Sequence, residues 1–219
     1  MPAPAGTPRV VECFYTLSSP WMYLGGPQLM QIIRRHRARL VLRPYDFPAV
    51  VPQNGGIPLR TRPEARQRYH ALELDRWRRH LGMPLNLRPR HYPPRDQRPA
   101  GRMVIAAQAR GLDAMLLSHA LLRALWAEDR DIADPAERVR IAEEAGLPGR
   151  ELLAEEESPA ILAEWARNNE DAVARGVFGS PTFFFGELWL WGQDRLFFLD
   201  RALAGEAVHD DADDTDNAP

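Results

Sequence analysis

Strand-forming residues occupy only the two ends of this chain, and the long segment between them has only helical periodicity. A β-rich run at residues 10–15 precedes Ser18-Ser19-Pro20, an apolar stretch over 21–33 and a second strand-like run at 40–45. Pro20 suits the first position of a helix. Strands this far apart cannot form a hairpin, but they suit a parallel strand-helix-strand unit. The chain is therefore predicted to open as an α/β protein.

The middle of the chain, residues 61–176, is predicted to be entirely helical. Leu74, Trp77 and Leu81 recur on one face of a helix over 64–81 that Gly82 ends, and further helices are predicted at about 101–111, 113–128, 135–145 and 159–175. Strand character returns at 182–185, where Gly186-Glu187 turns the chain into 188–191 as a hairpin. A closing helix is predicted over about 193–204.

Two strands, a helical insertion, a hairpin and a helix form the element order of a thioredoxin-like fold interrupted by helices. The predicted class is α/β: a thioredoxin-like domain of residues 9–60 and 177–204, with a large all-helical insertion domain of residues 61–176. Residues 205–219 are rich in aspartate and poor in apolar residues, so they are predicted to form a disordered acidic tail.

Composition excludes several classes of protein. Apolar residues make up 45% of the chain, but no run approaches the roughly 18 residues of a membrane helix, so we expect a soluble protein. The N-terminus shows no secretory signal, which makes the cytoplasm the expected compartment. The single cysteine, Cys13, excludes an intramolecular disulfide and a CxxC pair. The six histidines lack metal-ligand spacing, and the dispersed arginines do not indicate nucleic-acid binding.

Three short segments are candidates for chemistry, and each has a simpler structural interpretation. Ser19 precedes a helix at the end of the first strand, where it caps the helix or faces a ligand near the helix N-terminus. Ser180-Pro181 enters a strand, and a cis bond there would free the backbone of Ser180 for an extended ligand. Gln193-Asp194 lies at a strand-to-helix junction, where the carboxylate alone favours the helix dipole.

The chain resembles the 2-hydroxychromene-2-carboxylate isomerases in three stretches, residues 14–24, 176–183 and 191–195. These isomerases are related to the kappa-class glutathione transferases in the DsbA-like thioredoxin superfamily. Arg66-Gln67-Arg68-Tyr69, Asp75-Arg76-Trp77 and Gly82-Met83-Pro84 look like the helical-insertion pattern of that family. The resemblance covers roughly residues 9 to 204 and is specific only in combination.

The resemblance implies a glutathione site. Ser19 would take the position of the first cysteine of a CxxC motif and activate the glutathione thiol. Ser180 would offer its backbone beside a cis Pro181, and Gln193 and Asp194 would hold the γ-glutamyl end. Arg66 replaces a lysine that reaches the glycine carboxylate in relatives, and Asn54 matches a family asparagine only with a shifted spacing. The site residues that the resemblance implies are therefore Ser19, Ser180, Pro181, Gln193, Asp194, Arg66 and Asn54.

The implied activity is a glutathione-dependent isomerisation of a small aromatic or ring-derived substrate by a homodimer. A kappa-like transferase or peroxidase, and a non-catalytic protein that binds a peptide or thiol beside Pro181, are the alternatives. Cys13 is expected to be a buried packing thiol, and His70 and His80 flank a predicted helix that could border a pocket. Trp77, Trp165, Trp189 and Trp191 lie on periodic apolar faces and are expected in the core.

Overall fold

The sheet at the centre of the molecule has four strands in the order β2-β1-β3-β4. In the computed structural model, which describes residues 9–208, β1 (Val10–Tyr15) pairs in parallel with β2 (Arg39–Pro44) and antiparallel with β3 (Thr182–Phe185). β3 continues through a turn at Gly186 into β4 (Leu188–Trp191), which forms the edge of the sheet. The parallel unit and the hairpin predicted from the sequence are both confirmed.

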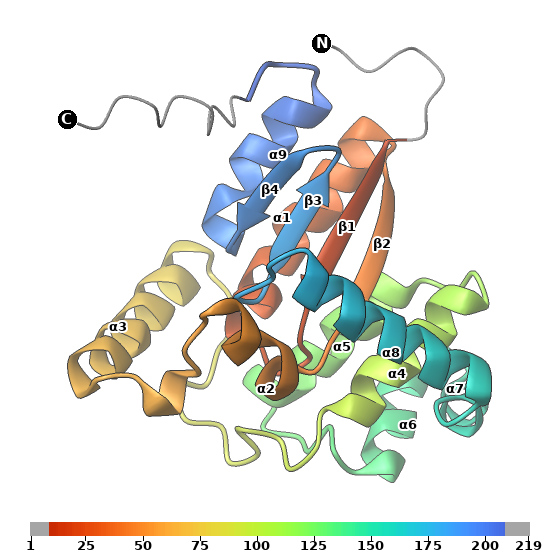
Figure 1. The fold of residues 1–219 in the computed structure, drawn as a ribbon. Helices are drawn as coiled ribbons and strands as arrows, with labels where there is room; N and C mark the ends of the chain where they lie inside the picture. The colour runs from red at the N-terminus through yellow and green to blue at the C-terminus, as the bar shows by residue number, and fades with distance from the viewer. Residues whose placement is uncertain (1–8, 209–219) are drawn as a thin grey trace, which may run out of the picture.

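The helices lie around this sheet in three groups (Figure 1). α1 (Pro20–His36) and α9 (Leu196–Leu203) pack together on one face, with the short helix η3 (Gln193–Arg195) between β4 and α9. α3 (Glu64–His80) stands to one side, after the short segments α2 (Phe47–Val50), η1 (Val51–Asn54) and η2 (Leu59–Thr61). The remaining helices gather on the side of the molecule away from α3, where α5 also packs against α1: α4 (Arg98–Ala109), α5 (Ala114–Trp126), α6 (Pro135–Glu144), α7 (Gly149–Glu155) and α8 (Pro159–Ala174).

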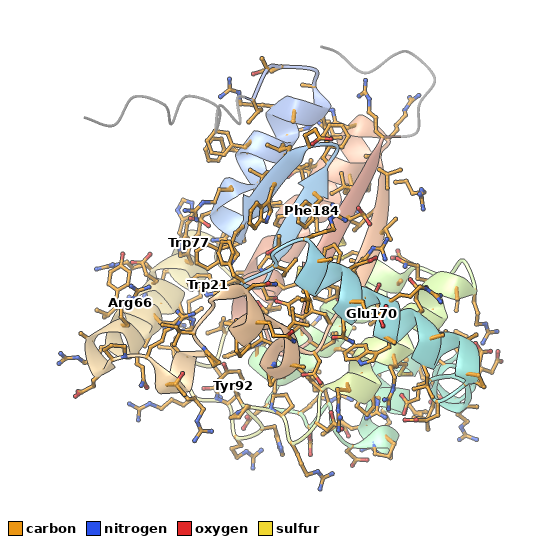
Figure 2. All side chains as sticks on the ribbon, viewed as in Figure 1. Trp21, Arg66, Trp77, Tyr92, Glu170 and Phe184 are labelled. Carbon is orange, nitrogen blue, oxygen red and sulfur yellow. The ribbon has the colours of Figure 1, made fainter. Side chains whose placement is uncertain are left out.

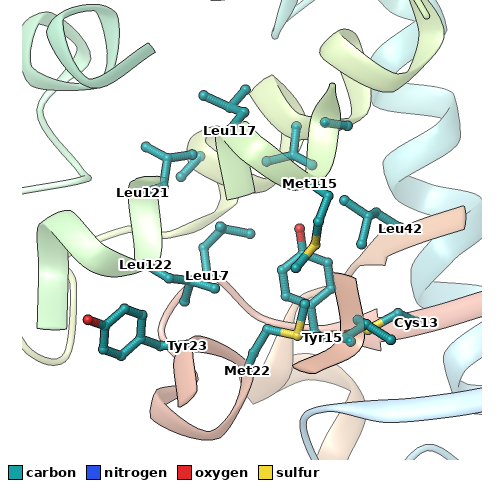
Figure 3. Close-up of a cluster of buried hydrophobic side chains, with 14 of the residues drawn as sticks. Cys13, Tyr15, Leu17, Met22, Tyr23, Leu42, Met115, Leu117, Leu121 and Leu122 are labelled. Carbon is teal, nitrogen blue, oxygen red and sulfur yellow. Dashed lines mark hydrogen bonds between the residues drawn. The ribbon is translucent and has the colours of Figure 1, made fainter. Parts of the chain in front are cut away.

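Alternation along β1 divides the buried side chains between the two faces of the sheet. Cys13 and Tyr15 belong to a large cluster that includes Met22 of α1 and the apolar side of α5 (Figure 3). Phe14 points to the other face, where it joins Tyr45 and Phe184 in a smaller cluster. The larger cluster runs without interruption from the sheet into the helices of residues 61–176. The thioredoxin-like fold class is confirmed, while the division into two domains stays a prediction.

Several local predictions need correction. α4 begins at Arg98 rather than near residue 101, because Pro99 lies at the start of the helix, where a missing N–H costs nothing. α2 and α7 were not predicted. Trp189 and Trp191 are 43% and 40% exposed rather than in the core, because they alternate with Leu188 and Leu190 along an edge strand. The predicted acidic tail falls mostly on residues 209–219, which lie outside the described residues.

Candidate functional site

Ser19 caps the N-terminus of α1 and also contacts the chain before β3. Its Oγ accepts a hydrogen bond from the backbone N–H of Met22 at 3.2 Å and donates one to the carbonyl oxygen of Ser180 at 3.2 Å. The side chain is buried at the helix end, where partial positive charge favours an anion. The capping interpretation of Ser19 is confirmed, and its role toward a ligand stays a prediction.

Ser180 faces Ser19 from the segment that enters β3. The Ser180–Pro181 peptide bond is cis. The Oγ of Ser180 accepts a hydrogen bond from the backbone N–H of Thr16 at 3.0 Å, and its backbone N–H has no partner within residues 9–208. Gly179 brings this segment against β4, because a Cβ there would collide with the indole of Trp191. An extended ligand could therefore pair with the backbone of Ser180 if the hydroxyl of Ser19 turns away from the carbonyl.

A cavity of about 130 Å³ opens beside Ser19 and Ser180. Its polar and backbone wall comes from residues 16–20 and 179–180, and its other wall is aromatic and basic: Trp21, Phe47, Arg62, His70, Tyr92 and Trp191. Figure 2 shows Trp21 where α3 approaches the sheet, with Tyr92 on the loop below. Arg62 is the cation of this lining and no carboxylate belongs to it, so the cavity favours an anionic ligand.

A second, larger hollow of about 460 Å³ adjoins the first and shares with it Ser18, Phe47, Leu59 and Tyr92. Its walls are rich in proline and arginine. Arg98 pairs with Asp96 at 2.8 Å, while Arg60 and Arg95 have no ion pair within the described residues. The two hollows together offer separate spaces for a thiol at Ser19 and for a second molecule beside it.

Gln193 and Asp194 lie next to α1, outside the lining of both hollows. Gln193 is buried, and its Oε1 lacks a hydrogen-bond partner within residues 9–208. It packs so closely on α1 that a Cβ at Gly25 would lie 2.6 Å from its own Cβ. Asp194 is exposed and pairs with Arg195 at 2.5 Å. The structure therefore gives Gln193 an unsatisfied acceptor and Asp194 an accessible carboxylate.

Arg66 and Asn54 also lie outside the lining of both hollows. Arg66 is exposed on α3 (Figure 2); burial, and after it the charge of Arg66, lower the pKa of the Arg62 guanidinium. Asn54 donates its amide hydrogens to the carbonyls of Ala172 at 3.2 Å and Val177 at 3.1 Å. In this geometry Asn54 holds the segment that leads to Ser180, and its predicted contact with glutathione stays a prediction.

Sequence reasoning missed several residues of the cavity, among them Phe47, Arg62 and Tyr92. Arg62 precedes the proline that opens α3, and its Nε donates to the carbonyl of Ile57 at 2.7 Å, which fixes the guanidinium at the cavity wall. Tyr92 lies on an irregular loop that no periodicity marks. The available signal was the position of Arg62, two residues before the first residue of α3 and eight residues before His70.

Cys13 takes no part in this site. It is fully buried, burial raises the pKa of its thiol, and its Sγ lies 3.9 Å from the Sδ of Met22. The expectation of a packing thiol is confirmed. Within residues 9–208, no cluster of histidine, cysteine, aspartate or glutamate side chains suits a metal ion. None of the helices in that range is both long and apolar enough to span a membrane.

The fold and the position of Ser19 define a class of protein. The family model of the DsbA-like thioredoxin domain matches residues 10–204, and the chain belongs to that family. A 2-hydroxychromene-2-carboxylate isomerase of Sphingobium xenophagum is 29% identical over 197 residues, which cover 89% of this chain and 98% of the relative. Glutathione S-transferase kappa 1 of Homo sapiens is 27% identical over 212 residues, covering 90% and 91%.

Solved structures agree on the fold. A 2-hydroxychromene-2-carboxylate isomerase superposes with a TM-score of 0.74 at 23% identity, covering 90% of this chain and 95% of that one. The cytosolic disulfide reductase DsbM of Pseudomonas aeruginosa, solved with GSH, gives 0.62 at 20% identity, covering 90% and 96%. The relationship to the isomerases and kappa-class transferases predicted from the sequence motifs is confirmed.

Proposed function

We propose that this chain is a glutathione-dependent isomerase similar to the 2-hydroxychromene-2-carboxylate isomerases. The observation that carries the proposal is the Ser19 hydroxyl, which lies at the N-terminus of α1 and 3.2 Å from the Ser180 carbonyl oxygen. A hydroxyl at this position activates a thiol of the cofactor without forming a mixed disulfide. The named activity of the curated relatives supports the same reaction class.

The residues around Ser19 fit glutathione. The backbone N–H of Ser180 has no partner within residues 9–208, and its carbonyl oxygen becomes available once Ser19 turns, so both can pair with the cysteinyl backbone. The buried Oε1 of Gln193 and the exposed carboxylate of Asp194 offer acceptors for the γ-glutamyl ammonium. Arg66 would complete the site at the glycine end, and Asn54 is a further candidate contact.

The chemistry at Ser19 is thiol activation. A free thiol with a pKa of about 8.5 is roughly 3% ionised at pH 7, whereas a pKa two units lower gives roughly 75%. Ser19 donates a hydrogen bond to the thiolate when its Oγ–H turns from the Ser180 carbonyl to the sulfur, and the N-terminus of α1 adds favourable charge. Bound glutathione would supply the nucleophile for reversible addition to the substrate double bond.

The second reactant in this proposal is a small aromatic or ring-derived anion. Trp21, Phe47 and Tyr92 provide flat apolar walls, and Arg62 provides the positive charge beside them. A kappa-like transferase or peroxidase is the second candidate, because glutathione S-transferase kappa 1 matches the chain over nearly its whole length. It would use the same serine and the same cavity on a different electrophile. A homodimer in the cytoplasm is part of the proposal.

Calorimetric titration with reduced glutathione tests the cofactor, and turnover of 2-hydroxychromene-2-carboxylate tests the reaction. We expect Ser19→Ala to bind glutathione but lose turnover, and Asp194→Ala to bind it more weakly. Ser158→Ala is the matched control, because Ser158 also caps a helix ahead of a proline and lies outside the cavity lining. No binding to the wild type would overturn the proposal. Conjugation of a chromogenic electrophile without isomerisation would favour the transferase.

A further inference from the structure

Trp21 and His70 form a hydrogen-bonded pair in the wall of the cavity beside Ser19. The indole Nε1–H of Trp21 donates to Nε2 of His70 at 3.2 Å, and the ring centroids lie 5.4 Å apart. An indole nitrogen is only a donor, so Nε2 must be the acceptor. A neutral imidazole has one acceptor and one donor nitrogen. The proton of His70 is therefore on Nδ1.

The environment keeps this imidazole neutral. Burial of the ring, together with the nearby Arg62 guanidinium, lowers the pKa of His70 to about 4. The other titratable group of the cavity wall is the Tyr92 phenol, whose pKa burial raises, so it is uncharged at neutral pH. A protonated His70 would also lose the acceptor that the Trp21 indole needs. The charge state and the tautomer are thus fixed by neighbours on α1 and on the segment before α3.

The Nδ1 atom remains available for a ligand. This nitrogen makes no hydrogen bond within residues 9–208. It is also not fully buried, so it is open to solvent. His70 and Arg62 line the same cavity as Ser19. A neutral N–H donor beside a cation matches a ligand with an uncharged oxygen acceptor next to a carboxylate.

We propose that His70 is a specificity-determining residue. Trp21 holds the Nδ1–H of His70 in place as a hydrogen-bond donor, and Arg62 binds the carboxylate of the second substrate. The Nδ1–H therefore selects substrates that have a carbonyl oxygen adjacent to that carboxylate. The inference rests on the proposed function for the use of such a substrate at Ser19. It does not require glutathione for the binding step. Trp21 is the positioning residue, because it acts on the ligand only through His70.

The tautomer is tested directly by nitrogen NMR of protein labelled in histidine. We expect His70 to be almost wholly the Nδ1–H form in the wild type at neutral pH. Trp21→Phe removes the donor and keeps an aromatic ring, so the tautomer ratio and the pKa of His70 should shift. Trp77→Phe is the matched control, because Trp77 and His80 form a similar ring pair at 5.6 Å without a recorded hydrogen bond. An Nε2–H form in the wild type, or an unchanged ratio in Trp21→Phe, would overturn the proposal.

Ligand selection is tested with two probes, coumarin-3-carboxylate, which has a ring carbonyl beside its carboxylate, and 2-naphthoate, which lacks one. His70→Phe should weaken binding of coumarin-3-carboxylate by about tenfold, because one hydrogen bond is lost. Binding of 2-naphthoate should weaken by less than about twofold. His70→Gln should restore part of the difference, because its amide both accepts and donates. Equal effects on both probes, or no binding of either to the wild type, would overturn the inference. If the wild type distinguishes the two probes but does not bind glutathione, only the proposed function would be refuted.

Discussion

Replacing Ser19 with alanine should have two separable effects, one on the stability of the fold and one on the thiol of bound glutathione. The substitution removes the cap of the Met22 N–H, which costs about 1 kcal/mol of stability. It also leaves the buried Ser180 carbonyl without its donor, which costs about 1 kcal/mol more. Ser158→Ala removes one longer cap bond of 3.5 Å, so it should cost about 1 kcal/mol or less.

The second effect concerns the thiol of bound glutathione. A hydrogen bond to a charged group contributes about 1.5–3 kcal/mol, so its loss should raise the thiol pKa by about one to two units. At pH 7 the ionised fraction would fall from about 75% to between about 25% and 3%. The assay is the ultraviolet absorbance of the thiolate as a function of pH, with denaturant unfolding for stability. The same thiol pKa in wild type and Ser19→Ala would refute the activation argument, whatever the stability change.

Three further predictions test other parts of the molecule. Asp194→Asn should weaken glutathione binding about tenfold in calorimetry, because a charge-assisted hydrogen bond is lost. Asp200→Asn, which breaks an ion pair with Arg35, should leave the affinity unchanged. Equal losses of affinity in the two variants would contradict the role of Asp194. Cys13 should resist alkylation in the folded protein and react only in denaturant, because it is fully buried with a raised pKa; rapid labelling of the native protein would show that it is accessible. The pKa of His70 is lowered to about 4 in the folded protein, whereas in the unfolded chain it is about 6.5. Between these two pH values the unfolded chain binds more protons than the folded one. The free energy of unfolding should therefore fall as the pH is lowered from about 6.5 to about 4. Denaturant unfolding should show a shallower fall in His70→Phe, and an identical pH dependence would contradict the lowered pKa.

The order of the strands along the chain and the first residues of α1 and α8 could be predicted from the sequence, because local signals determine them. Ser19-Pro20 and Ser158-Pro159 are cap and first-turn pairs, and both helices begin there. Local signals do not show which strand forms the edge of the sheet. Trp189 and Trp191 have the alternation of a half-buried strand, and only the sheet order shows that they stay partly exposed on β4.

The side of the candidate site around Ser19 and Ser180 was predictable from the sequence, and on the opposite wall His70 was expected near a pocket. Ser19 and Ser180 were found because their motifs are short and lie at element ends, and the structure joins them by a hydrogen bond. The opposite wall combines Arg62 from the segment before α3 with Tyr92 from an irregular loop. These segments meet only through tertiary packing, so no periodicity or spacing in the chain indicates that they share a cavity.

The segment before β3 is held by hydrogen bonds at three of its residues. Asn54 holds the Val177 carbonyl, the Tyr45 hydroxyl holds the Gly179 carbonyl at 2.9 Å, and the Thr16 N–H holds the Ser180 side chain. Because three separate elements restrain it, little conformational entropy remains to be lost when a ligand pairs with this backbone. Affinity at Ser180 should therefore depend on Asn54 and Tyr45 as preorganising residues, even where neither touches the ligand.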